Sequence, residues 1–318
     1  MKEENNLVSR VKRYSKVTTS MTSLATKFAG KKYLNFDLND QKYAAQITEI
    51  LGNLKGPLMK VAQLSATIPD LLPEEYARKL AELQSNAPPM SWVFVKRRMK
   101  AELGENWQSN FKEFNQEASF AASLGQVHKA KLKTNDYVAC KLQYPDMSSA
   151  VEADLNQLKI IFKIYSSYNK SIQIREIYKE IEARLKEELN YSLENKHLKI
   201  FKFIHKNNSY IKIPNVYEKI STNRLLVMEF LNGKKLIEYK NAPQKTRNEL
   251  AKKLFMAWYL PFYKYGIIHG DPHLGNYSVD NKNNINLFDY GCVRIFPPKF
   301  VKGVIDLYFA LKEKDNKR

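Results

Sequence analysis

The chain has 318 residues, of which 44% are hydrophobic, so it can bury a real core and is not globally disordered. Its length suits two or three domains or one large two-lobed domain, and its two cysteines, Cys140 and Cys292, exclude a disulfide scaffold and favour a reducing compartment. A formal net charge of +19 implies an acidic partner: nucleic acid, nucleotide phosphates or an anionic membrane surface.

The first 32 residues predict a basic amphipathic helix over residues 5–32. Seven apolar residues recur there at spacings of three or four: Leu7, Val11, Tyr14, Val17, Met21, Leu24 and Phe28. Lysines and arginines fill much of the remainder, so this helix either lies on an anionic membrane or docks on its own protein. The stretch lacks the apolar region of a secretory signal.

Helical patterns continue over residues 41–85, broken around 67–75, and residues 86–92 have the composition of a linker. From residue 118 the pattern becomes two antiparallel strands joined by the turn "KTND", with a glycine-containing loop before them. A long helical region is predicted over 148–204. Strands follow in "PNVYEKI" (214–220) and "RLLVMEFLNG" (224–233).

Helices resume over residues 245–265. The richest apolar run of the chain is "LFMAWYLPFY" (254–263), too short to span a membrane, which predicts a core helix ending near Pro261. One further helix and a charged tail follow from 297. The order of elements indicates an α+β chain in two lobes, and a cleft between lobes commonly binds a ligand.

Candidates for the parts of a kinase site follow one another along the chain in kinase order. Phosphoryl transfer needs a cradle for phosphates, a cation, metal ligands and a group that orients the nucleophile. The segment "AASLG" (121–125) is predicted to form the phosphate-covering loop, and Lys141 of "VACK" to supply the cation. Glu188 is predicted to be the carboxylate that holds Lys141 in place. The backbone near Glu229 and Leu231 suits a hinge that bonds adenine.

The segment "HGDPHLGN" (269–276) and the later "DYG" (289–291) complete this order. Asp271 is predicted to orient the nucleophile or water, and Asn276 with Asp289 to hold Mg²⁺, which prefers oxygen ligands. Each motif alone has an ordinary explanation: a solvated lysine on a strand, or a simple turn at "DYG". His269 is assigned a buried structural role, and the role of His273 is left open.

Two departures separate the chain from an ordinary protein kinase. Gly270 stands where H-R-D has arginine, and no A-P-E follows the "DYG", with only 27 residues after Gly291. "HGD" also occurs in small-molecule kinases of the aminoglycoside phosphotransferase type.

The remaining motifs resemble the UbiB/aarF-domain (ADCK) atypical kinase-like family over roughly residues 45–300. "LKGPLMKVAQLSA" (54–66) is similar to its K-x-G-Q motif, "AASLGQVHKA" to its alanine-rich loop, "EELNYSLEN" to its E-x-D motif, and "HGDPHLGN" to its catalytic loop. The resemblance implies a protein-kinase-like two-lobed fold with an N-terminal helical extension. It also implies ATP or ADP with Mg²⁺, and a link to ubiquinone biosynthesis and lipid homeostasis.

Residue by residue, the resemblance makes Lys60 and Gln63 the K-x-G-Q pair on a helix that covers the peptide groove. It assigns Ala121, Ala122, Ser123, Leu124 and Gly125 to the loop and Lys141 to the nucleotide. Departures are Ala62 for the motif's glycine, Asn190 for the aspartate of E-x-D, and Tyr290 for the phenylalanine of D-F-G. The early end of the chain predicts a short or incomplete C-lobe.

The predicted domains are an N-terminal helical extension over 1–115, a kinase-like N-lobe over 116–235 and a partial C-lobe over 236–318. The leading function is an Mg²⁺-dependent ATPase or small-molecule or lipid kinase; the alternative is a nucleotide-switched scaffold that holds lipid or a protein complex. Expected partners are nucleotide, an anionic membrane surface, isoprenoid-quinone lipid and other ubiquinone-biosynthesis proteins. Nucleic acid is not expected, because aromatic and basic residues form no recognisable binding motif. The expected location is cytoplasmic, peripheral to the inner face of the membrane.

Overall fold

The computed structural model describes residues 90–122, 124–152, 155–156, 159, 174–271 and 273–313. These residues fall into two compact units, of which the larger spans Pro89–Pro145 and Lys186–Arg318. The other unit contributes Asp146–Leu185 to the described part, including most of helix α7 (Ile174–Glu188). The helices predicted over 5–32 and 41–85 lie outside the described residues, and the predicted domain boundaries stay predictions.

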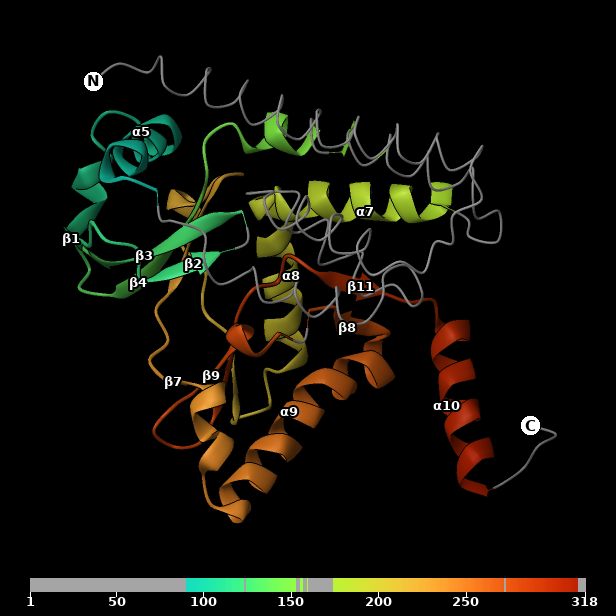
Figure 1. Cartoon of the computed structure of the whole chain (residues 1–318). Helices are drawn as coiled ribbons and strands as arrows, with labels where there is room; N and C mark the ends of the chain where they lie inside the picture. Colours follow the sequence, from blue (N-terminus) through green and yellow to red (C-terminus); the bar gives the residue numbers. More distant parts are fainter. Residues whose placement is uncertain are drawn as a thin grey trace, which may run out of the picture. The chain divides into compact units, whose positions relative to one another are not determined.

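A five-stranded antiparallel sheet opens the larger unit (Figure 1). Its strands run in the order β1, β3, β4 and β6, with β2 paired to β3. Their bounds are β1 (Phe111–Phe114), β2 (Phe120–Ala122), β3 (Gly125–Leu132), β4 (Tyr137–Gln143) and β6 (Leu225–Glu229). The strand pair predicted over 118–142 is therefore confirmed, and so is the strand within 224–233.

The turn between β3 and β4 forms where "KTND" predicts it. Leu132 and Asp136 close it, since the Leu132 N–H donates to the Asp136 carbonyl at 2.9 Å. Asn135 within it has φ +71°, a left-handed conformation that asparagine tolerates better than most residues. This local chemistry fixes the register that places Lys141 opposite Val127 on β3 and Leu226 on β6.

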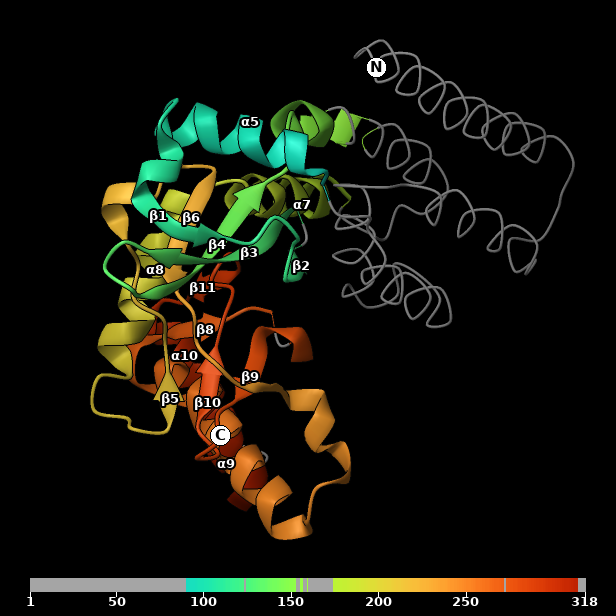
Figure 2. The ribbon, with the colours of Figure 1, turned by 90° about the vertical axis from the view of Figure 1, so that its left-hand side faces the viewer.

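One face of this sheet is covered by helix α5 (Trp92–Leu103), followed by the short helix η2 (Trp107–Asn110) (Figure 2). Val95 and Met99 of α5 are fully buried in a cluster with sheet residues such as Val138 and Leu225. The guanidinium of Arg98 donates to the carbonyls of Gln143 and Tyr144 at 3.1 Å each, so α5 is also bonded to the end of β4.

Helix α8 (Tyr191–Ile204) follows α7 after a break at Leu189 and Asn190. Asn190 is the N-cap, and its side-chain oxygen accepts from the Leu193 N–H at 3.0 Å. Asparagine and aspartate are equally good N-caps. Asn190, which replaces the aspartate of the E-x-D motif, therefore serves the structure as the cap of α8. The long helical region predicted over 148–204 is confirmed for α7 and α8 as two helices rather than one.

The second half of the larger unit consists of short strands and long helices. Its sheets have the orders β5-β10-β9-β7 and β11-β8. The elements are β5 (Ile211–Lys212), η3 (Glu218–Ile220), β7 (Lys234–Lys235), η4 (Leu236–Asn241), α9 (Gln244–Tyr265), β8 (Ile267–His269), η5 (Leu274–Asn276), β9 (Tyr277–Val279), β10 (Ile285–Leu287), β11 (Val293–Ile295) and α10 (Pro298–Glu313).

Two local predictions about this half are wrong. The strand expected over 214–220 is an isolated bridge between Val216 and Met228 followed by η3, because Tyr217 bonds back across a tight turn to Ile220. Helix α9 confirms the helix predicted over 245–265, but it does not end near Pro261: it continues to Tyr265, where Gly266 caps it with φ +69°. No described helix is long and apolar enough to cross a bilayer.

Pro261 costs α9 one hydrogen bond, since proline has no N–H to give to the carbonyl four residues earlier, that of Ala257. His205, the C-cap of α8, is buried, and neither of its ring nitrogens has a hydrogen-bond partner among the described residues. Burial lowers the pKa of His205 to about 4, although the Ala257 carbonyl opposes the shift.

Gly125 at the start of β3 permits an approach that no other residue allows. A Cβ there would lie 2.1 Å from the Leu142 carbonyl oxygen. Gly125→Ala is therefore expected to destabilise the protein by about 3 kcal/mol or more, because backbone must move. Urea unfolding measures this.

Gly303 in α10 provides the matched control, because a Cβ there meets nothing within 4 Å. Gly303→Ala is expected to stabilise the protein by about 0.5–1 kcal/mol through helix propensity. Equal effects of the two substitutions would contradict the close approach at Gly125.

Candidate nucleotide site

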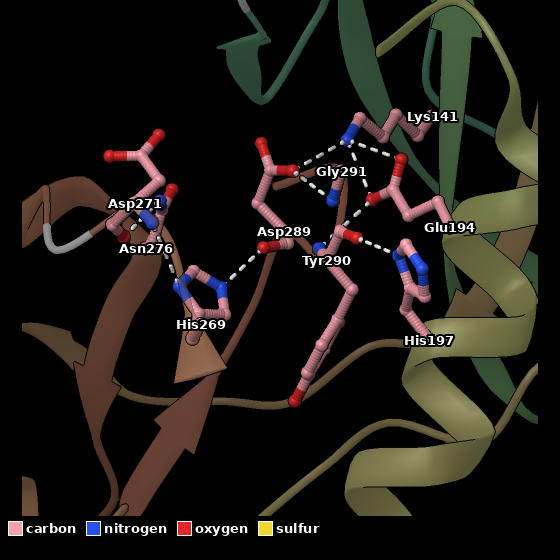
Figure 3. A network of polar contacts seen from close by, with 9 residues as sticks. All are labelled: Lys141, Glu194, His197, His269, Asp271, Asn276, Asp289, Tyr290 and Gly291. Carbon is pink, nitrogen blue, oxygen red and sulfur yellow. Dashed lines mark hydrogen bonds and ion pairs between the residues drawn. The ribbon is translucent and has the colours of Figure 1, made fainter. Parts of the chain in front are cut away.

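Lys141 is a buried cation at the centre of the predicted site (Figure 3). Its ammonium lies 2.7 and 2.9 Å from the two carboxylate oxygens of Glu194 and 3.3 Å from Oδ1 of Asp289. Burial by itself lowers the pKa of Lys141, but these two carboxylates outweigh it and hold that pKa well above its usual range. Lys141 is therefore charged when it meets a ligand.

The carboxylate that holds Lys141 is Glu194, so the prediction of Glu188 for this role is wrong. Glu188 is the last residue of α7, whereas Glu194 lies one turn into α8, beyond the break capped by Asn190. After the break, Glu194 on α8 reaches the ammonium of Lys141 on β4. Burial raises the pKa of Glu194 to about 6 against the opposing effect of Lys141, so the two residues form an ion pair near neutral pH.

Glu188 nevertheless lies beside the "DYG" turn, and its place in the nucleotide site stays a prediction. A Cβ at Gly291 would be 3.8 Å from Cγ of Glu188. The side chain of Glu188 thus lies close to Gly291, whereas Lys141 bonds Glu194 and Asp289.

The "DYG" turn is held by α8 from two sides. The Tyr290 N–H donates to Glu194 at 3.4 Å, and its carbonyl accepts from Nδ1 of His197 at 3.0 Å. Tyr290 itself is fully buried, and its hydroxyl donates to the Leu287 carbonyl. Because Glu194 also binds Lys141, the position of α8 fixes the cation and the turn together.

Asp289 adopts a backbone conformation that few residues accept. Its φ is +56°, in the left-handed region, and its Oδ1 accepts from the Gly291 N–H at 3.2 Å as well as from Lys141. Strained backbone of this kind concentrates at functional sites, where it aims a side chain. In Figure 3 the carboxylates of Asp289 and Asp271 extend to the same side, away from His269.

His269 connects the catalytic loop to the "DYG" turn. Its Nε2 contacts the Asp289 carbonyl, which can only accept, and its Nδ1 receives the Asp271 N–H at 3.4 Å. The ring is therefore the neutral tautomer with its proton on Nε2. His269 is fully buried and packs against Phe201 and Tyr290, which confirms its structural role.

The loop from Asp271 to Asn276 is closed by its own hydrogen bonds. The Asn276 side-chain amide donates to the Asp271 carbonyl at 3.3 Å, and the Asp271 carboxylate accepts from the His273 N–H at 3.2 Å. The ring of His273, whose role the sequence leaves open, accepts from the Gly275 N–H at 3.1 Å and closes the turn. Because the Asn276 amide bonds the Asp271 carbonyl through its nitrogen, its oxygen points away from the loop backbone.

Gly270 has a steric reason to be glycine. Its N–H donates to the Cys292 carbonyl at 2.6 Å, and a Cβ at this position would lie 2.8 Å from the Cys292 sulfur and 3.1 Å from that carbonyl oxygen. The arginine of an H-R-D loop does not fit while β8 and the "DYG" segment are this close. The sequence shows the substitution but not this cause.

Gly270→Ala is expected to lower the free energy of unfolding by about 1–3 kcal/mol, because overpacking must shift Cys292. Removing the sulfur as well, in Gly270→Ala with Cys292→Ala, is expected to restore part of that loss. Thermal unfolding of the two single variants and the double variant gives the coupling. If the changes in unfolding free energy of the two single variants simply add in the double variant, the added methyl group at residue 270 does not clash with the Cys292 sulfur.

The predicted phosphate loop is described in part. Ser123 lies outside the described residues, and so do Lys60 and Gln63; Ala121 is described for its backbone only. Ala122 pairs with Gly125 across a two-residue turn, and Leu124 is buried, with its carbonyl accepting from the Tyr144 N–H. The loop is thus a tight hairpin anchored to the end of β4 beside Lys141.

The predicted hinge uses its side chains for structure. The Glu229 carboxylate accepts from the backbone and side chain of Asn215 at 3.2 and 2.7 Å, and the Phe230 N–H donates to the Tyr137 carbonyl. Among the described residues, the Leu231 N–H bonds no other backbone group. That N–H is therefore available to the edge of a base.

The donor set around Asp289 fits Mg²⁺. One carboxylate and one amide oxygen, from Asp289 and Asn276, are hard ligands of the type this ion takes alongside water and phosphate oxygens. Among the described residues no group of three His, Cys, Asp or Glu side chains gathers to hold a metal unaided. A metal at this place would rely on phosphates for the rest of its ligands.

Sequence reasoning missed Glu194, His197 and Tyr191. The first two lie three residues apart on α8, so they share one face of the helix. That spacing is the only signal in the sequence, and it is common in helices. Tyr191 directly follows the N-cap, a position at which sequence alone indicates no contact.

Comparison with known proteins gives one family. Residues 82–318 match the model of the ABC1 atypical kinase-like domain. The protein ACTIVITY OF BC1 COMPLEX KINASE 7, chloroplastic, of Arabidopsis thaliana is 31% identical over 280 residues, 86% of this chain and 40% of the relative. The atypical kinase COQ8, mitochondrial, of Saccharomyces cerevisiae is 27% identical over 258 residues, 80% of this chain and 52% of the relative.

A solved structure supports the same fold. The complex of Rv3197 with erythromycin from Mycobacterium tuberculosis aligns with a TM-score of 0.60 and 27% identity, over 82% of this chain and 68% of that one. The chain spans about two fifths to a half of the two curated relatives above. The α+β, kinase-like fold predicted from the sequence is confirmed.

Proposed function

The chain belongs to the ABC1 atypical kinase-like family, and from this premise we propose that it is an ATP-binding protein acting as an Mg²⁺-dependent ATPase or small-molecule or lipid kinase. One observation supports this above the others: Lys141 bonds both Glu194 and Asp289. That triangle, tied through His269 to the loop of Asp271, is an arrangement for holding and transferring a phosphoryl group.

Each side chain has one task in this proposal. Lys141 faces the α- and β-phosphates, and the Leu231 N–H takes the base edge. Asp271 orients the attacking hydroxyl or water and accepts its proton as the γ-phosphoryl group passes to that oxygen and ADP leaves. His269 fixes the positions of Asp271 and Asp289 relative to each other, because its two ring nitrogens bond the backbone of both residues.

Asn276 and Asp289 would hold the magnesium ion. When bound, Mg²⁺ supplies positive charge that neutralises the phosphate oxygens. The chain's own contribution is to aim the two ligands, through the bond from Asn276 to the Asp271 carbonyl and the left-handed backbone of Asp289.

The proposed setting is ubiquinone biosynthesis at a membrane, with the protein peripheral to its inner, cytoplasmic face. The family resemblance supports the link to ubiquinone, and the net charge of +19 supports an anionic surface. Isoprenoid-quinone lipid and other biosynthetic proteins are the partners this setting implies. Attraction to the surface is screened beyond about 8 Å at physiological salt, so contact must be close.

ATP hydrolysis tests the proposal. The protein is assayed with Mg²⁺, with and without vesicles that contain anionic lipid and an isoprenoid quinone. Asp271→Asn is expected to lower kcat at least about 100-fold while nucleotide affinity changes little, because Asp271 acts on the nucleophile. Asp136→Asn, an exposed aspartate in the β3–β4 turn, serves as control.

A scaffold that uses nucleotide only as a switch is the alternative. The tight closing of the catalytic loop by its own hydrogen bonds favours it. Tight Mg²⁺-dependent binding without turnover in any vesicle would select the scaffold, and absence of nucleotide binding would contradict both functions.

A further inference from the structure

We propose that Tyr191 is a positioning residue for the nucleotide phosphates: its ring orients Lys141. The inference rests on the proposed function and adds a residue to that site. Tyr191 belongs to helix α8, its ring lies against Lys141 of strand β4, and its hydroxyl lies near Gly125 at the start of β3.

The backbone of Tyr191 is fixed from two sides. It is the first residue of α8, directly after the N-cap Asn190, and its N–H donates to the Asn223 carbonyl at 3.2 Å. The residue is only 2% exposed, inside the cluster that contains Ala139 and Leu226 of the sheet. The ring therefore has one place in which to lie.

The face of that ring lies against the Lys141 ammonium, whose nitrogen is 5.2 Å from the ring centroid. Glu194 and Asp289 already supply two negative charges, so a third charged partner would repel an incoming phosphate. An aromatic ring attracts the cation through its quadrupole and brings no net charge. Burial raises the pKa of the Tyr191 hydroxyl above its usual range, against the opposing effect of Lys141, so the side chain stays neutral.

The hydroxyl end of Tyr191 meets the base of the loop. A Cβ at Gly125 would lie 3.1 Å from this oxygen, on the side where the Leu142 carbonyl is also close. Gly125 pairs with Ala122 of the loop strand and with Gln143 at the end of β4. A shift of the α8 N-terminus would therefore move both Lys141 and the foot of the loop.

The experiment compares ADP with adenosine, because only ADP carries the phosphates that Lys141 faces. In Tyr191→Leu, which removes the ring, affinity for Mg²⁺-ADP is expected to fall about 3- to 10-fold, the range of a partly buried cation–π contact. Affinity for adenosine is expected to stay within about twofold. Tyr191→Phe keeps the ring and is expected to bind both ligands within about twofold of the unmodified protein.

Phe111→Leu is the matched control. Phe111 is a buried aromatic residue in a separate core cluster, which also contains Val95 and Met99 of α5. Phe111→Leu is therefore expected to lower stability and to leave the affinities for ADP and adenosine unchanged. If Tyr191→Leu does not fold, Tyr191→Met carries the same expectation, because its unbranched, flexible side chain adapts better to the space that the ring leaves. Unmodified protein that binds no Mg²⁺-ADP would overturn the proposed function itself.

Two results would overturn the role of Tyr191 while the proposed function stands. One is an unchanged ADP affinity in Tyr191→Leu. The other is an equal loss for adenosine and ADP, which is what general loosening of the site produces.

Discussion

Asp289→Asn is expected to abolish most Mg²⁺-dependent nucleotide binding, raising the Kd of Mg²⁺-ATP at least about 100-fold, or roughly 3 kcal/mol. The substitution removes the only charged ligand among the two predicted for the metal. It also removes one of the two carboxylates that hold Lys141, whose ammonium lies 3.3 Å from Asp289.

Asparagine is chosen at position 289 because it removes the charge of the side chain and changes little else. It tolerates the left-handed φ of +56° better than most residues, and its side-chain oxygen still accepts from the Gly291 N–H. Binding is measured by calorimetry with Mg²⁺ and again with EDTA. Asp136→Asn is the control, and an unchanged affinity in Asp289→Asn would remove the metal site from the proposal.

Glu194→Gln is expected to have the second large effect, on stability and on binding. Lys141 would keep only Asp289 as a charged partner in a buried place, and removing one partner of a buried pair is strongly destabilising. We expect the free energy of unfolding to fall by about 2–3 kcal/mol, below the usual loss because Asp289 remains. The Tyr290 N–H would keep an acceptor, since glutamine retains one oxygen.

Glu188→Gln provides the contrast, because it alters the carboxylate that sequence reasoning paired with Lys141. Its effect on unfolding is expected to be at least about 1 kcal/mol smaller than that of Glu194→Gln. Urea unfolding of Glu194→Gln and Glu188→Gln measures the two free energies of unfolding, and equal losses would contradict the pairing of Glu194 with Lys141. In the double variant Glu194→Leu with Lys141→Met, an apolar pair replaces the ion pair, and stability is expected to exceed that of Glu194→Leu alone.

These variants converge on one property of the fold: α8 holds the cation and the "DYG" turn at once. Glu194 bonds Lys141 and the Tyr290 N–H, His197 bonds the Tyr290 carbonyl, and Tyr191 lies under Lys141. A displacement of α8 therefore changes the nucleotide cation and the metal ligand together. If the proposed function holds, contacts made with α8 are expected to change nucleotide affinity.

Local signals in the sequence predict the elements well. The alternation and turn residues of 118–142 specify β3 and β4, and the apolar run before Gly266 specifies α9. Predictions fail where a contact from elsewhere decides: α9 continues through Pro261, and residues 214–220 form only a bridge to β6 and a short helix. The functional roles of the predicted site residues stay predictions, and Lys60, Gln63 and Ser123 lie outside the described residues.

The sequence by itself determined which chemical groups the site contains, because Lys141, Asp271, Asn276 and Asp289 lie in short motifs whose order is fixed along the chain. The tertiary structure decided which groups touch. Glu194 rather than Glu188 pairs with Lys141 across 53 residues, and Cys292 rather than the loop itself requires glycine at 270. The reason is physical: a motif records residues that are close in the chain, whereas an ion pair or a steric contact depends on where a helix starts and which face it presents.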